Sequence, residues 1–219
     1  MKYIYHHLGL GDHIICNGLV RFYQNIYNDI SIFCKNHNYD NVSYMYRDNP
    51  LINIIKVIDD NNVNDYIINN NIQNDIILVG FTGENRDESS SFDEAFYFQH
   101  KIPFSKRFDN YYFERDLDLE QKIIKELNPN NEKYIFTHNI DKSKINTNLK
   151  IIDNPVDYSI FNLISLIENA EEVHLMESSI KNLVNSYKMD KPKFFYHKYV
   201  RGYPEWNNTK SLNNFEIIH

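Results

Sequence analysis

The most constraining feature of this sequence is a short apolar stretch that runs through two glycines into a helical pattern. The letters YHHLGLGDHIICNGLVRFYQ, residues 5–24, follow a strand expected over 2–5 and place Gly9 and Gly11 before a helix expected over 13–27. A strand, a tight glycine turn and a helix in this order are typical of a doubly wound α/β sheet. The backbone N–H groups of such a turn can bind phosphate, so the stretch suggests a phosphate site as well as a fold.

The same alternation continues along the chain and then restarts. Apolar, β-branched runs predict six further strands, over 30–35, 52–58, 75–81, 133–138, 149–153 and 172–177, and a last one over 193–199. Amphipathic patterns predict helices over 63–72, 92–104, 116–127, 158–170 and 178–188, with a polar loop over 82–94. We therefore expect an α/β protein of two small Rossmann-like lobes that face each other across a cleft.

The restart near residue 130 also predicts the domain boundaries. Residues 1–105 would form the N-terminal lobe, and residues 131–219 the C-terminal lobe. Residues 106–130 would connect them. In such sheets ligands bind at the carboxyl ends of the strands, where the glycine turn and the corner at 177–179 both lie.

Composition limits the class of protein. A hydrophobic fraction of 42% is enough for a packed core, and a formal net charge of −7 argues against nonspecific nucleic-acid binding. The sequence shows neither a signal-peptide pattern nor an apolar run near ~18 residues, so we expect a cytoplasmic protein without a membrane span. Cys16 and Cys34 lie among apolar neighbours and are interpreted as buried thiols.

The glycine turn differs from a dinucleotide fingerprint. In G-x-G-x-x-G the third glycine would stand where Ile14 is, and the second strand ends in Cys34 and Lys35 where a ribose-binding carboxylate belongs. The turn instead offers Asp12. Two interpretations are open: an N-cap for the helix, or a general base whose ionised form the helix N-terminus would favour.

A second strand-to-helix corner carries Glu177, Ser178 and Ser179. Free N–H groups and serine hydroxyls at a helix start suit a phosphate ligand, although an ordinary serine N-cap explains the same letters. Another loop, which follows the strand over 133–138, carries Lys142 and Lys144 beside His138 and can supply positive charge to an anionic ligand.

The stretch LGLGDHIICNGLVRFY resembles the N-terminal motif of heptosyltransferase-type glycosyltransferases, which have the GT-B fold. Residues 161–189 resemble the donor-site region of the same family. The resemblance implies that Asp12 is the catalytic base, that Glu177 contacts the ribose or sugar of the donor, and that Ser178 and Ser179 receive the pyrophosphate. This sequence departs from the family at Ser179, where the family has glycine, in lacking a later histidine, and in its shorter length. The corner also resembles the Ser-Ser loop of GT-B fucosyltransferases, so the donor stays open.

Several further residues are candidates for the site. Gly11 would bring backbone N–H groups to the nucleotide, and His7, His13 and Arg201 could contact the acceptor or a sugar. The histidines match no standard metal-ligand spacing, and the aspartates of the 116–118 stretch open a helix, where carboxylates are favoured anyway. We therefore expect no metal and no cofactor.

The sequence as a whole favours an enzyme. It would move a sugar from a nucleotide-sugar, as co-substrate, to a glycan or lipid-linked saccharide. Alternatives are a nucleotide-sugar-binding protein without transferase activity, a dinucleotide-dependent oxidoreductase and a plain interaction module. The donor base, the acceptor, the stereochemical outcome and the oligomeric state stay open.

Overall fold

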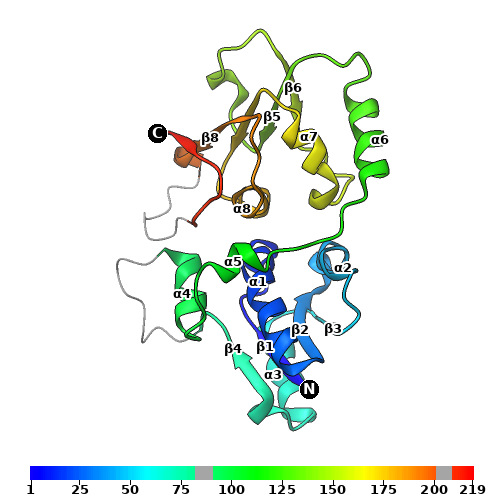
Figure 1. Cartoon of the computed structure of the whole chain (residues 1–219), viewed down its shortest axis with the longest axis vertical. Coiled ribbons are helices and arrows are strands. Elements are labelled where there is room, and N and C mark those ends of the chain that lie inside the picture. Colours follow the sequence, from blue (N-terminus) through cyan, green and yellow to red (C-terminus); the bar gives the residue numbers. More distant parts are fainter. Residues whose placement is uncertain (82–90, 201–208) are drawn as a thin grey trace. The chain divides into compact units, whose positions relative to one another are not determined.

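A computed structural model describes residues 1–81, 91–200 and 209–219, and divides them into two compact units (Figure 1). The first unit comprises residues 1–114 with Thr209 and Lys210 from the C-terminal segment. The second comprises residues 115–200 and 211–219. Arg201, a candidate from the sequence, lies outside the described residues.

The first unit is built on a parallel sheet of four strands in the order β3-β2-β1-β4. Its elements are, in chain order, β1 (Lys2–Tyr5), α1 (Leu10–Tyr27), β2 (Ile30–Lys35), α2 (Tyr39–Tyr46), β3 (Ile52–Val57), α3 (Asp60–Asn69), β4 (Ile76–Leu78), α4 (Phe92–Phe98) and α5 (Lys106–Asp109). The first of the two expected Rossmann-like lobes is thereby confirmed.

Helices cover both faces of this sheet, because successive apolar side chains of each strand point to opposite faces. On one face Tyr3 and Phe33 pack against Tyr66 of α3, with ring centroids 6.4 and 5.5 Å from that ring. Ile4 and Ile32 alternate with these rings and are fully buried on the other face, where α1 packs against β2. Both layers are needed because parallel strands are apolar on both sides.

The sequence prediction omitted α2 and placed two strands in succession. The letters YDNVSYMY hold tyrosine, asparagine and valine, all weak helix formers, so the local preference gives little sign of a helix. Val42 and Met45, three residues apart, are fully buried and hold the helix in place. A parallel pair such as β2 and β3 needs a crossover connection, and α2 provides it.

Helix α1 approaches α5 closely at Gly18. A Cβ atom at this position would lie 2.3 Å from the carbonyl oxygen of Lys106 and 2.9 Å from that of Arg107. Arg107 is completely buried and forms an ion pair with the equally buried Asp93 of α4. The same carboxylate accepts a hydrogen bond of 3.0 Å from the backbone N–H of Lys210, which attaches the C-terminal segment to this unit.

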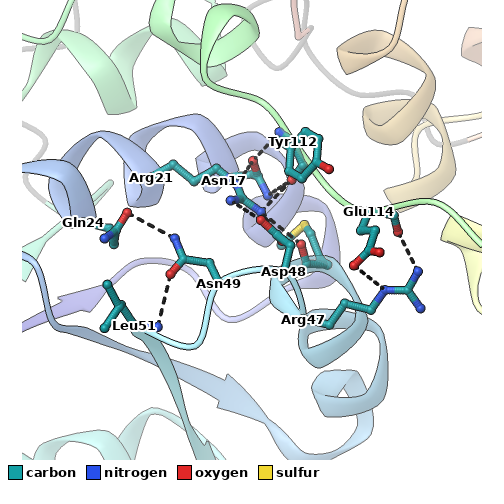
Figure 2. Close-up of polar contacts among 10 residues, drawn as sticks. Asn17, Arg21, Gln24, Arg47, Asp48, Asn49, Leu51, Tyr112 and Glu114 are labelled. Carbon is teal, nitrogen blue, oxygen red and sulfur yellow. Dashed lines mark hydrogen bonds and ion pairs between the residues drawn. The ribbon is translucent and has the colours of Figure 1, made fainter.

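Figure 2 shows the polar contacts of Arg21 in α1 together with those of neighbouring residues. The Arg21 guanidinium donates two hydrogen bonds of 2.8 and 2.9 Å to the carboxylate of Asp48 and one of 2.9 Å to the carbonyl of Tyr112. The group also lies 5.4 Å from the ring centroid of Tyr46 and 5.2 Å from that of Tyr112. Asn17, one turn earlier, exchanges two hydrogen bonds with the backbone of Tyr112. The chain segment that ends the first unit is thus attached to α1.

The second unit is built on a parallel sheet of five strands in the order β6-β5-β7-β8-β9. Its elements are, in chain order, α6 (Leu117–Leu127), β5 (Tyr134–His138), η4 (Lys142–Lys144), β6 (Lys150–Asp153), η5 (Ile160–Leu163), α7 (Ile164–Glu168), β7 (Glu172–Leu175), α8 (Ser179–Ser186), β8 (Lys193–His197), η6 (Lys198–Val200) and β9 (Phe215–Ile218). This unit confirms the second expected lobe.

A charged cluster fixes α6 against the rest of the second unit. Glu120 is fully buried and accepts hydrogen bonds from Arg115 and from both the backbone N–H and the hydroxyl of Ser165. Arg115 also contacts Glu168 at 3.0 Å. Every oxygen of the buried carboxylate therefore has a donor, as a buried charge requires.

Strand β9 was not predicted, because four residues near the chain end give little pattern. It pairs in parallel with β8, with Phe194 opposite Phe215. The expected helix over 158–170 begins as the 3₁₀ turn η5 and continues as the short helix α7.

Cys16 and Cys34 are both free and buried, which confirms the expectation of buried thiols. Within the described ranges, every helix falls short of the length and apolar character needed to cross a membrane.

Candidate functional site

The turn between β1 and α1 positions Asp12. Helix α1 begins earlier than predicted, with Gly9 as its N-cap and no side-chain cap, so the interpretation of Asp12 as the N-cap is wrong. Asp12 is the third helical residue, and its carboxylate folds back over Gly9. A Cβ atom on Gly9 would lie 2.6 Å from Oδ2 of Asp12, so glycine is needed here for space.

The electrostatics of Asp12 also differ from the expectation of an ionised carboxylate at neutral pH. Its side chain is 21% exposed, and burial raises its pKa to about 7. Hydrogen bonds from the backbone N–H groups of Asp12 and Gly9 act in the opposite direction without cancelling the effect of burial. A carboxyl with a pKa near neutrality can both take up and release a proton under physiological conditions.

His7 lies beside this carboxyl. Its Nε2 is 3.2 Å from the carbonyl oxygen of Gly80, and its Nδ1 is 3.9 Å from Oδ1 of Asp12. Because a carbonyl only accepts, Nε2 carries the proton, and in the neutral ring Nδ1 presents a lone pair toward Asp12. The lone pair thus faces Asp12 at a distance that is longer than a hydrogen bond.

The neighbouring histidines are buried below the turn. His13 is fully buried, and its ring lies edge-on to His6 with centroids 4.4 Å apart. Burial lowers the pKa of His6 to about 4 and that of His13 well below its usual value, so both are neutral. The expectation that His13 contacts an acceptor therefore needs correction, because its ring has no exposed surface. His7, which is partly exposed, keeps that role as a candidate.

In the second unit, the corner after β7 places Glu177 and Ser178 at the start of α8. Ser178 is the N-cap: its hydroxyl accepts a hydrogen bond of 3.3 Å from the N–H of Lys181 and donates one of 3.2 Å to the carbonyl of Met176. Ser179 is the first helical residue and is partly buried. Two serines thus stand at the positive end of the helix dipole.

Lys181 is a residue that sequence analysis missed. Its Nζ lies 2.9 Å from Oε2 of Glu177 and 4.4 Å above the ring centroid of Tyr196, and its side chain is 5% exposed. The only sequence signal was the four-residue spacing between Glu177 and Lys181, which spans the strand-to-helix corner. Because the pair neutralises itself, Glu177 is already engaged by a cation, and a ligand would meet this carboxylate together with Lys181.

The loop after β5 carries the remaining candidates. His138 is the last residue of β5 and pairs in register with Leu175 of β7. Lys142 contacts Asp153, at the end of β6, at 2.8 Å. Lys144 rests on the ring of Tyr199, with Nζ 3.7 Å from the centroid. The structure therefore brings His138, Lys142 and Lys144 to one edge of the sheet, next to the β7–α8 corner.

Asp153 is a second residue that the sequence did not single out. Its carboxylate accepts a hydrogen bond of 2.7 Å from Thr137 and contacts Lys142. Burial raises its pKa, but these two partners outweigh burial, and the net effect is a lowered pKa. Asp153 is therefore ionised at neutral pH and orients Lys142.

Comparisons with known proteins identify the fold. No protein-family model matches the sequence, and no curated protein matches it significantly. The structure is similar to the crystal structure of the glycosyl transferase family 9 from Veillonella parvula DSM 2008, with a TM-score of 0.59 and 7% identity over 99% of this chain and 86% of that chain. The chain has a GT-B-like fold.

In this GT-B-like fold each Rossmann-like unit has a topological switch point. There two adjacent parallel strands are followed by connections that lead toward opposite ends of the sheet. In the first sheet it lies between β1 and β4, the two strands whose ends are joined by the contact between His7 and Gly80. In the second it lies between β5 and β7. Strand β5 is followed by the loop that carries Lys142 and Lys144, and β7 is followed by the corner at Ser178. Ligands bind at such points in open α/β sheets.

The described residues contain no group of three or more histidine, cysteine, aspartate or glutamate side chains that could hold a metal ion. Gly11 lies in the first turn of α1, between Gly9 and Asp12. Its N–H is one of the free donors that a helix start presents.

Proposed function

We propose that this chain is a glycosyltransferase that moves a sugar from a nucleotide-sugar donor to a hydroxyl of a glycan or lipid-linked saccharide. The acceptor oxygen gives its proton to Asp12 and forms a bond to the anomeric carbon of the donor. The bond between that carbon and the diphosphate breaks, and the nucleoside diphosphate leaves with the electron pair.

One observation carries this proposal. In each unit of a fold shared with a family 9 glycosyl transferase, the candidate residues follow the strands on either side of the switch point. The acid–base pair of His7 and Asp12 belongs to the first unit, and the serines and lysines suited to an anion belong to the second. Each unit thus contributes one of the two kinds of group that sugar transfer needs, a base for the acceptor and donors for the diphosphate.

Asp12 is suited to the role of base by its environment. A general base works best when its pKa lies near the working pH, and burial brings the pKa of Asp12 to about 7. Nδ1 of His7 lies 3.9 Å from Oδ1 of Asp12, so the imidazole is a polar neighbour of the proposed base but lies beyond hydrogen-bond distance.

The diphosphate would lie at the β7–α8 corner. Backbone N–H groups at the start of α8, with the hydroxyls of Ser178 and Ser179, provide donors for its oxygens. Lys142 or Lys144 provides positive charge from the neighbouring loop, so that the charge developing on the leaving group is met by an ammonium group.

The experiment combines binding and turnover. A thermal-shift panel of ADP, UDP, GDP and their sugars identifies the donor base, because a ligand at a hundredfold excess over its dissociation constant raises stability by about 2.7 kcal/mol. Asp12→Asn should keep this shift and lose at least about 100-fold in transfer rate. Ser179→Ala should weaken nucleoside diphosphate binding, whereas Lys188→Ala, at an exposed lysine paired with Asp190, serves as the matched control. Normal turnover by Asp12→Asn would show that Asp12 is not the base. If no nucleotide or nucleotide-sugar changes the melting temperature, the proposed function is wrong.

A nucleotide-sugar-binding protein without transferase activity is the second candidate. It is favoured by the observation that two lysines near the corner, Lys142 and Lys181, are already paired with carboxylates. A bound donor that is neither hydrolysed nor transferred, with any acceptor saccharide, would decide for this candidate. A shift by NAD(P) in place of nucleoside diphosphates would decide for an oxidoreductase.

A further inference from the structure

Four polar side chains form a continuous hydrogen-bonded row within the second unit, from Glu172 to Tyr199. Nε2 of His174 lies 3.1 Å from Oε2 of Glu172, and Nδ1 of His174 lies 2.9 Å from Nε2 of His197. Nδ1 of His197 lies 3.1 Å from the hydroxyl oxygen of Tyr199. The two histidines are 6% and 2% exposed, so the row runs through the interior from β7 to η6.

With both rings neutral and the carboxylate ionised, one arrangement of protons satisfies every atom in this row. The carboxylate of Glu172 accepts, so Nε2 of His174 carries the proton and Nδ1 accepts. His197 must then donate from Nε2 and accept at Nδ1, and the hydroxyl of Tyr199 donates to it. Burial lowers the pKa of His174, and lowers that of His197 to about 4, so both rings are neutral as this arrangement needs.

The row ends at Tyr199, which contacts the loop that carries Lys142 and Lys144. The ring of Tyr199 carries the ammonium of Lys144, whose Nζ lies 3.7 Å from the ring centroid. Burial and the Asp141 carboxylate raise the pKa of Tyr199, and a hydrogen bond from the backbone of Asp141 counters them. Tyr199 is thereby fixed on one side by His197 and on the other by the loop that holds Lys144.

The contact with Tyr199 leaves the charge of Lys144 available. Lys142 and Lys181 rest against the carboxylates of Asp153 and Glu177, which neutralise them. An aromatic ring attracts a cation through its quadrupole without neutralising its charge. Lys144 also helps to lower the pKa of the Asp141 carboxyl, but that carboxylate accepts hydrogen bonds from Ser143. The side chain of Lys144 is exposed to solvent. It is therefore the lysine of this loop best placed to meet an anion.

We propose that Tyr199 is a positioning residue for the diphosphate site: the row from Glu172 through His174 and His197 fixes its ring, and the ring holds Lys144 toward the leaving diphosphate. This inference rests on the proposed function. It adds a residue that touches no substrate and acts through Lys144, and it assigns a purpose to two buried histidines.

The geometry can be tested without any ligand. Long-range ¹H–¹⁵N spectra of the full-length, ¹⁵N-labelled protein report which ring nitrogen of each histidine carries the proton. We expect the Nε2–H form for His174 and His197. Tyr199→Phe keeps the ring and removes the hydroxyl, and should move the Nδ1 resonance of His197 toward that of a nitrogen without a hydrogen bond. An Nδ1–H form of His197, or an unmoved Nδ1 resonance in Tyr199→Phe, would overturn the row.

The binding experiment uses whichever of ADP, UDP or GDP stabilises the wild-type protein. Tyr199→Leu should weaken its binding about 2- to 5-fold, as expected for the loss of a cation–π contact. In a double-mutant cycle, Tyr199→Leu should add nothing to Lys144→Ala, whereas it should add its full effect to Lys142→Ala, the matched control.

The outcomes separate the two proposals. If the wild-type protein binds none of the three diphosphates, the proposed function fails. If it binds one and Tyr199→Leu binds it equally well, or if the effects of Tyr199→Leu and Lys144→Ala are additive, the positioning role alone fails. Tyr199→Phe keeps the aromatic face and loses the hydrogen bond to His197, so its binding should fall between that of wild type and that of Tyr199→Leu. Binding by Tyr199→Phe equal to that of wild type would show that the row does not position the ring. A thermal unfolding curve of each variant checks that it is folded.

Discussion

Gly9 and Asp12 occupy the same turn so closely that a Cβ atom on Gly9 would lie 2.6 Å from the Asp12 carboxylate. The backbone of Gly9 has an ordinary extended conformation, with φ of −73° and ψ of 147°, so the requirement for glycine is one of space and not of strain. The position of the proposed base therefore depends on the absence of a side chain three residues before it.

Gly9→Ala should displace the Asp12 carboxylate and reduce transfer by at least about 10-fold. The protein should remain folded, because the displaced atoms are the end of a short side chain and a clash of this kind costs about 1 kcal/mol. Nucleoside diphosphate affinity should be unchanged, since the candidate donor residues of the second unit are untouched. Transfer rate and affinity measured on the same preparation check this, and an unchanged rate would contradict it.

Asp12→Asn should stabilise the protein at neutral and alkaline pH. The folded state holds the Asp12 proton up to about pH 7, whereas the unfolded chain releases it near the ordinary pKa of aspartate, 3.8. The native carboxyl therefore destabilises the fold increasingly as the pH rises from about 4 to 7. Asparagine has no such charge, so the variant should gain on the order of 4 kcal/mol above pH 7 and little near pH 4. Urea unfolding at pH 4.5, 6 and 7.5 measures the difference, which should grow across the series.

The same titration predicts the pH dependence of catalysis. A general base acts only when deprotonated, so kcat/KM should rise with pH through an apparent pKa near 7 and then level off. Steady-state rates between pH 5 and 9 test this. A profile that is already flat from pH 5 upward would show that the carboxyl titrates far below this value.

Gly18→Ala should destabilise the first unit, although alanine is the better helix former. A Cβ atom would lie 2.3 Å from the carbonyl oxygen of Lys106, which is backbone and cannot rotate away. Separation of α1 from α5 should cost about 2 kcal/mol. Asn25→Ala, on the exposed part of the same helix, is the control and should stabilise by about 0.5 kcal/mol. Chemical denaturation measures the free energy of unfolding of both variants, which should fall for Gly18→Ala and rise for Asn25→Ala.

Arg21→Met should destabilise the first unit by about 3 kcal/mol, because it leaves Asp48 without its bidentate partner in a largely buried position (Figure 2). Removal of the stranded charge should recover part of the loss, so the double variant Arg21→Met, Asp48→Asn should be more stable than Arg21→Met. Free energies of unfolding for the four proteins of this cycle measure the coupling. Equal stability of the single and double variants would mean that the ion pair is not what holds these residues.

The sequence by itself determined the local elements and the two corners. Regular alternation of apolar strands with helical stripes predicted both Rossmann-like units, and the glycine turn and the Glu177–Ser178 corner indicated where ligands would bind. These signals are local, because periodicity and turn chemistry are written in neighbouring residues. The elements it missed, α2 and β9, have weak local patterns and are held by contacts with distant residues.

Only the tertiary structure decided the chemical state and the partners of the site residues. Burial moves the pKa of Asp12 to about 7 and encloses His13. The row that joins Glu172 to Tyr199 combines residues from two neighbouring strands and a 3₁₀ turn, which meet through the pairing of β7 with β8. A residue type states which proton a side chain can carry. The dielectric around it and the groups within about 3 Å decide whether it carries that proton, and both depend on chain segments far away in the sequence.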